Sequence, residues 1–155
     1  MTSKKKQEIF TESILERTIN IPFKMIGSNL KQHLENKLKK LYESKCVEEG
    51  YIQNDSINII NYSGGRINGE NIVFTIVFSC MICLPIENMN VTCVIQNITK
   101  AGIKAKLDKY TNSPMIIYIS RDHHYDNELF SKLKEEDEIS VKIIGHRFEL
   151  YDENI

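Results

Sequence analysis

The chain has 155 residues, which is room for one mid-sized domain or for two small ones. Hydrophobic residues make up 41% and charged residues 26%, a composition that excludes a disordered, collagen-like or coiled-coil protein. Twenty basic residues stand against 21 acidic ones, and the net charge of −1 is compatible with a local basic patch but not with a basic coat over phosphate.

The N-terminal residues predict the compartment. The basic stretch Lys4–Lys6 is followed by no apolar run of signal-peptide length, so we expect an intracellular protein. The longest uncharged stretch, Ile72–Ile86, has 15 residues and is rich in Ile, Val, Phe and Thr. A membrane-spanning helix needs about 20 apolar residues, so this stretch predicts a buried strand and we expect no membrane contact.

The first predicted elements are a strand and a helix. Loose alternation with β-branched residues predicts a strand over Glu8–Ile21, with Pro22 at its edge, where a missing N–H does least harm. Ser28 or Asn29 can then cap a helix over Ser28–Lys45. The apolar positions that define this helix form one stripe: Leu30, Leu34, Leu38, Leu41 and Tyr42.

Strands and turns follow the helix. Tyr51–Tyr62 contains alternating apolar and polar residues, and Ser63–Gly65 is a turn signal. The dipeptide Asn68–Gly69, the strongest hairpin signal, leads into the long apolar strand Ile72–Leu84. A strand, a helix and antiparallel strands together predict a compact α+β domain over residues 1–85.

The second half alternates in short segments. The predicted strands are 89–96, 103–107, 115–119 and 139–144, and one or two helical turns fit within Asp126–Leu133. Four or five short strands with a small helix between the third and the fourth are the order of an OB-type β-barrel. We therefore predict the α+β class, with a small barrel over residues 86–155 after the first domain.

The cysteines indicate neither a disulfide framework nor a metal site. Cys80 and Cys83 have the spacing of half a zinc site, but no second Cys or His pair follows at a suitable distance. Residues three apart in a strand also point to opposite faces. Together with Cys46 and Cys93 they are predicted to be reduced core residues, and we expect no metal and no cofactor.

The sequence contains no recognisable catalytic constellation. Ser63–Arg66 lacks the ending of a phosphate-binding loop and precedes a strand, and a Gly-x-Ser-x-Gly elbow does not occur. The acidic run Glu135–Glu138 is typical of a solvated turn. We therefore predict no catalytic residues.

The order of motifs along the chain resembles a known family. The second half resembles the ribosomal S-one-type OB domain, through the segments Asn97–Ile103, Ile117–His124 and Glu136–Gly145. The first half, through Glu12–Ile21, Pro22, Phe23, residues 27–30 and the helix, is similar to the tip domain of one protein family. That family is the seventh-subunit stalk protein of eukaryotic RNA polymerase II, with its archaeal and large-DNA-virus counterparts. The resemblance covers roughly Ile9 to Leu150.

The resemblance implies a non-catalytic subunit of a DNA-directed RNA polymerase. Its first domain would dock at the clamp base, against the largest subunits and a sixth-subunit-like protein. A fourth-subunit-like stalk partner would lie alongside, and the barrel would contact nascent single-stranded RNA. The docking candidates are Phe10, Ile21, Pro22, Phe23, Gly27 and Asn29.

The candidates for RNA binding are cationic and aromatic residues of the second half: Lys100, Lys104, Lys106, Tyr118, Arg121, His123, His124 and Arg147. Lys104 and Lys106 share one side of a strand, where they either line a groove or form a solvated face. Tyr118 either presents its ring outward or packs in the core. The two histidines are solvated or RNA-facing loop residues rather than metal ligands.

Two departures from the S-one-type pattern concern RNA binding and closure of the barrel. The position after the glycine turn, where such domains usually carry an aromatic residue, is held by Ile103, Lys104 and Ala105. The last strand is short, supplied by another segment, or absent. The alternative function is a free-standing RNA-binding module of translation or RNA decay. For the polymerase subunit we expect the nucleus or a cytoplasmic viral factory, with packaging into the virion as a further option.

Overall fold

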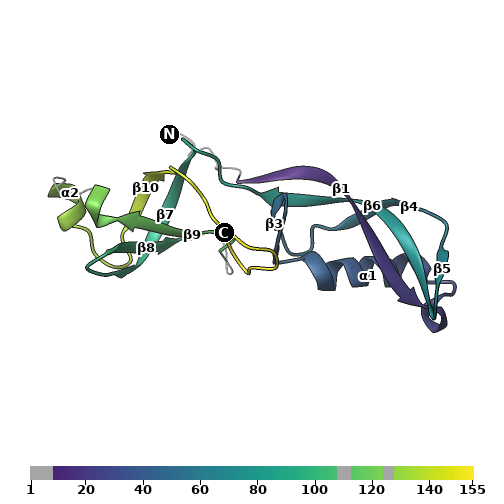
Figure 1. Ribbon diagram of the computed structural model, residues 1–155. Helices are drawn as coiled ribbons and strands as arrows, with labels where there is room; N and C mark the ends of the chain where they lie inside the picture. Colours follow the sequence, from purple (N-terminus) through teal and green to yellow (C-terminus); the bar gives the residue numbers. More distant parts are fainter. Residues whose placement is uncertain (1–8, 108–112, 124–127) are drawn as a thin grey trace. The chain divides into compact units, whose positions relative to one another are not determined.

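The computed structural model describes residues 9–107, 113–123 and 128–155, which fold into two compact units (Figure 1). The first unit contains Glu8–Leu84 together with Glu149–Asp152. The second contains Pro85–Phe148 and Glu153–Ile155. Among the described residues, no helix is both long enough and apolar enough to span a bilayer.

The sheet of the first unit is built around one long strand. Its strands are β1 (Phe10–Pro22), β2 (Cys46–Val47), β3 (Gly50–Ile52), β4 (Asn58–Tyr62), β5 (Arg66–Asn68) and β6 (Asn71–Cys83). β6 pairs with β1 along its whole length and, at its other edge, with β3, β4 and β5 in turn. β2 pairs with β3. All these pairings are antiparallel. The predicted β5–β6 hairpin is present, but its two turn residues are Gly69 and Glu70, because Asn68 still pairs with Asn71.

Helix α1 (Leu30–Tyr42) packs on one face of this sheet. Leu34 and Leu38 are fully buried against a core that β1 and β6 supply from alternate positions. The core residues of the two strands are Leu15, Ile19, Ile21, Phe74, Ile76, Phe78, Cys80 and Ile82. The predicted helical stripe is thus confirmed, except that Leu41 is 37% exposed.

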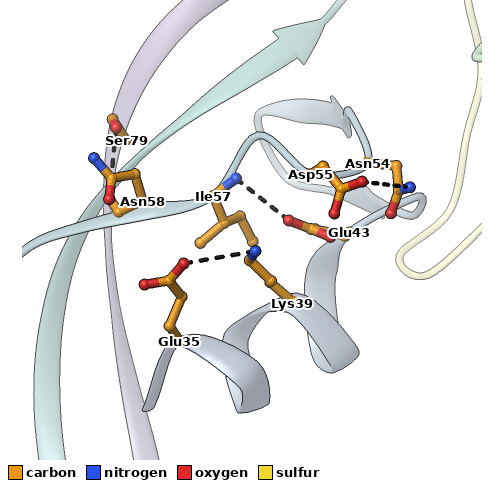
Figure 2. A network of polar contacts seen from close by, with 8 residues as sticks. All are labelled: Glu35, Lys39, Glu43, Asn54, Asp55, Ile57, Asn58 and Ser79. Atoms are coloured by element: carbon orange, nitrogen blue, oxygen red, sulfur yellow. Dashed lines mark hydrogen bonds and ion pairs between the residues drawn. The ribbon is translucent and has the colours of Figure 1, made fainter. Parts of the chain in front are cut away.

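Polar contacts tie the end of α1 to the strands (Figure 2). Glu43, the residue that ends the helix, is buried, and its carboxylate accepts a hydrogen bond of 3.3 Å from the backbone N–H of Ile57. Glu35 and Lys39 form an ion pair of 3.5 Å one turn apart. At the other end Asn29 holds the N-cap position without a side-chain hydrogen bond to the helix. A 3₁₀ turn, η1 (Phe23–Met25), separates the helix from β1.

The second unit has four described strands: β7 (Asn90–Ile98), β8 (Gly102–Lys106), β9 (Ile116–Ser120) and β10 (Glu138–Lys142). They pair antiparallel in the order β10–β7–β8–β9. The short turns η2 (Arg121–His123) and α2 (Glu128–Ser131) lie between β9 and β10. The sheet is a curled half-barrel over a core of Ile95, Ile103 and Phe130. The predicted α+β class is confirmed, and the half-barrel is consistent with an OB-type domain.

The free edge of β9 is met by the last residue of the chain. The N–H of Ile116 donates to the carbonyl of Ile155, and the N–H of Ile155 donates to the carbonyl of Pro114, both at 2.9 Å. Among the described residues, no regular strand follows β10. Residues 149–152 belong to the first unit, where Tyr151 and Asp152 exchange backbone hydrogen bonds of 2.8 Å with Cys46.

All four cysteines are free and buried. Burial is the main reason why the pKa of Cys46, Cys80 and Cys93 is raised to about 11 and that of Cys83 to about 12. Protonated thiols are poor nucleophiles. We therefore expect that no thiol of the native chain reacts with DTNB at pH 8, and that all four react in denaturant. Rapid reaction of a native thiol would contradict this.

The same pKa shifts give a pH dependence of stability. Thiols of the unfolded chain ionise near their ordinary value of 9.0, whereas the buried thiols keep their protons to about pH 11. In this window the unfolded state binds fewer protons than the folded state, so the free energy of unfolding falls as pH rises. Urea midpoints at pH 8 and pH 10 measure the fall, and it should be smaller in a Cys80→Ala variant.

Candidate nucleic-acid interface

The outer face of the second sheet carries three of the predicted RNA-binding residues. Ile103 and Ala105 of β8 are buried, so the alternate positions Lys104 and Lys106 face outward. Lys104 pairs with Tyr118 of β9, whose side chain is 73% exposed. The ring is therefore presented outward instead of packing in the core, and a cation and an aromatic ring lie side by side. Such a pair suits stacking on a base next to a phosphate contact.

The turn between β7 and β8 carries two more candidates. Thr99 and Gly102 exchange backbone and side-chain hydrogen bonds that close the turn around the exposed Lys100. Arg121 follows β9 directly, and its backbone N–H donates to the carbonyl of Ala101 at 3.1 Å. Its guanidinium donates to the carbonyl of Thr99 at 3.0 Å. Lys100 and Arg121 are thus brought to one place, although 20 residues of sequence separate them.

The remaining candidates are not gathered with these groups by any described contact. Arg147 is exposed in the irregular segment after β10. The backbone of His123 ends η2, and His124 lies outside the described residues. No group of three or more His, Cys, Asp or Glu side chains that could hold a metal ion occurs in the described part of the chain.

The predicted docking residues divide into two places. Ile21, Pro22, Phe23, Gly27 and Asn29 lie around the end of β1, whereas Phe10 is at the opposite end of this 13-residue strand, beside Tyr51. Ile21 is only 1% exposed and packs in the core of its own unit, so its side chain is not part of the exposed surface around the end of β1.

An exposed apolar surface lies near the end of β1, and we call it the tip patch. It consists of Phe23, Met25, Ile26 and Ile67, which are 46%, 43%, 37% and 70% exposed. The backbone N–H of Phe23 donates to the carbonyl of Glu70 in the β5–β6 turn at 3.3 Å, which holds η1 against that turn. Exposed clusters of large apolar residues typically mark interaction sites.

The sequence of the chain is similar to sequences of proteins described as RNA polymerase subunits. No family model matches the chain. It is 24% identical over 155 residues to DNA-directed RNA polymerase II subunit 7 of Arabidopsis thaliana, a match that covers 90% of this chain and 85% of the plant protein. It is 29% identical over 119 residues to a protein of Acanthamoeba polyphaga mimivirus that is provisionally assigned as a DNA-directed RNA polymerase subunit. The chain is a homologue of RNA polymerase subunits.

The predicted resemblance to the seventh-subunit type is confirmed by these matches. The mimivirus match covers 74% of the chain, and the chain spans about half the length of that relative, 56%. The plant match extends over both units of the polymerase-subunit homologue.

Sequence reasoning missed two kinds of residue in this polymerase-subunit homologue. Thr99 and Phe130 fix the guanidinium of Arg121: the carbonyl of Thr99 accepts a hydrogen bond from it, and the ring centroid of Phe130 lies 5.3 Å from its Cζ. No pattern in the local sequence links either residue to Arg121. Lys142 is exposed at the end of β10, opposite Asn90. The alternation of Ile139 and Val141 could have predicted its outward direction.

Proposed function

We propose that the chain is a non-catalytic stalk subunit of a multisubunit DNA-directed RNA polymerase of a large DNA virus, acting in initiation and elongation. The observation that carries this proposal is the similarity to RNA polymerase II subunit 7 along 90% of the chain. The similarity to a mimivirus protein supports a viral source. The proposed location is a nucleus or a cytoplasmic viral factory, with packaging in the virion.

The tip patch is the proposed docking surface on the polymerase. Its apolar side chains would be buried against the clamp base formed by the largest subunits and a sixth-subunit-like protein, while a fourth-subunit-like protein would complete the stalk. Burial of apolar area contributes about 25 cal/mol per Å², so a cluster of large side chains can anchor such an interface. A net charge of −1 suits a subunit that is held by protein contacts and touches RNA secondarily.

The outer face with Lys104, Lys106 and Tyr118 is the proposed RNA contact. Its position supports this role, because OB-type domains bind oligonucleotides on the face of their second and third strands, to which β8 and β9 correspond. One exposed ring offers stacking of about 1–3 kcal/mol per base, which would give weak and sequence-tolerant contact.

Co-purification tests the docking proposal. A tagged chain expressed in infected cells is expected to bring down the two largest polymerase subunits. A Phe23→Ser, Ile67→Ser double variant should lose most of this yield, because both side chains are exposed in the tip patch. Ile60→Ser is the matched control, since Ile60 is 53% exposed on β4 outside the patch.

The proposal fails if the unmodified chain brings down neither subunit. Sub-micromolar, salt-sensitive RNA binding by such a polymerase-free chain would favour the alternative of a free-standing RNA-binding module.

A further inference from the structure

An open pocket of about 640 Å³ lies beside the β7–β8 turn. It is lined by Ile98, Thr99, Lys100 and Arg121. Two of these residues carry a positive charge, and no carboxylate is among the described lining residues. A pocket with two cations and no acid favours an anionic ligand.

The guanidinium of Arg121 is held in place before any ligand arrives. It donates to the carbonyl of Thr99 at 3.0 Å, and it lies over the ring of Phe130, with Cζ 5.3 Å from the ring centroid. A planar guanidinium fixed in this way presents its remaining N–H groups in a set geometry, which matches the oxygens of a phosphate.

The hydrogen bonding of Arg121 is also incomplete. Its Nε is buried and has no hydrogen-bond partner among the described residues. Buried donors in folded proteins are nearly always satisfied, and an exception asks for an explanation such as a bound water or ion. Because Nε has almost no accessible surface, a ligand in the open pocket would reach the guanidinium through its other N–H groups.

We propose that this pocket binds an internal phosphate of single-stranded RNA, an inference that rests on the proposed RNA contact. Lys100 supplies charge from the turn, and Arg121 supplies directed N–H donors. The described lining residues supply two cations and no aromatic side chain, which suits contact with the RNA backbone. It sits on the loop between the first and second strands, one of the two loops with which OB-type domains bind oligonucleotides. The RNA would thus be held here by its backbone, and one of its bases would stack on the ring of Tyr118 on the outer face.

The test is binding of a 5′-fluorescent RNA 12-mer to the full-length chain, followed by anisotropy at several salt concentrations. Lys100→Gln should raise the Kd about fivefold and lower the slope of log K against log salt by about 0.7, the value for one lost phosphate contact. Arg121→Lys keeps the charge, so it should raise the Kd with little change in slope. Lys31→Gln, on the exposed face of α1, is the charge-matched control and should leave both quantities unchanged.

A second arm distinguishes an internal phosphate from a chain end or a free ion. Unlabelled RNA with a 5′-hydroxyl and with a 5′-phosphate should shift the Arg121 Nε–H resonance equally, and inorganic phosphate at the same concentration should shift it less. A shift that requires the 5′-phosphate, or equal binding by all variants, overturns the proposal.

Co-purification separates failure of the pocket proposal from failure of the proposed stalk function. Lys100→Gln should co-purify with the polymerase as the unmodified chain does, because Lys100 is outside the tip patch. If the chain binds no RNA while co-purification persists, the pocket proposal is wrong and the stalk assignment stands.

Discussion

Replacing Phe78 with alanine is expected to lower the free energy of unfolding of the first unit by about 3–5 kcal/mol. The side chain is completely buried on β6, and its ring is stacked with that of Tyr42, at 6.5 Å between centroids and 11° between planes. Truncation would leave a cavity between the helix and the sheet, and it would remove an aromatic contact worth about 0.5–1.5 kcal/mol. Urea unfolding followed by far-UV circular dichroism measures the loss.

Ile14→Ala is the control for this variant. Ile14 lies on β1, directly beside the core position Leu15, but its side chain is 67% exposed. Substitutions at such surface positions usually change stability by less than about 0.5 kcal/mol. Equal losses in the two variants would contradict the placement of the core on the helix-covered face.

Gly102→Ala is expected to destabilise the second unit by about 1–3 kcal/mol, the usual cost of forcing atoms into a packed site. A Cβ at this position would lie 2.1 Å from the backbone carbonyl oxygen of Ile119 and 3.1 Å from its carbon. Backbone cannot swing aside as a flexible side chain can, so β8 and β9 must separate at this point. The turn that holds Lys100 and the contact of Arg121 with Thr99 would be disturbed as well.

Gly145→Ala is the matched control in the same unit, because a Cβ there would meet nothing within 4 Å. Two-dimensional ¹⁵N NMR spectra of both variants separate a local rearrangement from a general loss of structure. Shifts in Gly102→Ala should concentrate in β8, β9 and η2. Unchanged stability in this variant would show that the two strands do not approach as closely as the structure indicates.

The elements that the sequence predicted are those with strong local periodicity. The leucine stripe located α1, and Asn68–Gly69 located the hairpin, because both patterns depend only on neighbours in sequence. The alternating segment Tyr51–Tyr62 is divided between β3 and β4 by residues 53–57. Both pieces pair with β6, but at different places along it, and pairing between distant segments leaves no local trace.

In the candidate sites, too, the features that depend on neighbouring residues could be predicted, and those that depend on strand pairing could not. The outward direction of Lys104 and Lys106 follows from strand alternation, which the sequence contains. The meeting of Lys100 with Arg121 depends on the pairing of β8 with β9 and could not be read from spacing. Phe10 was grouped with the docking residues, but a 13-residue strand at about 3.3 Å per residue places it far from η1.

The arrangement around β6 has a consequence for how the first unit comes apart. Every other strand of that sheet is hydrogen-bonded to β6 itself, apart from β2, which is joined through β3. Among the described strands, the β2–β3 pair alone would keep its hydrogen bonds after β6 departs, and the helix would lose the sheet on which it packs. A sheet in which most strands pair with the same central strand should unfold in a single cooperative transition.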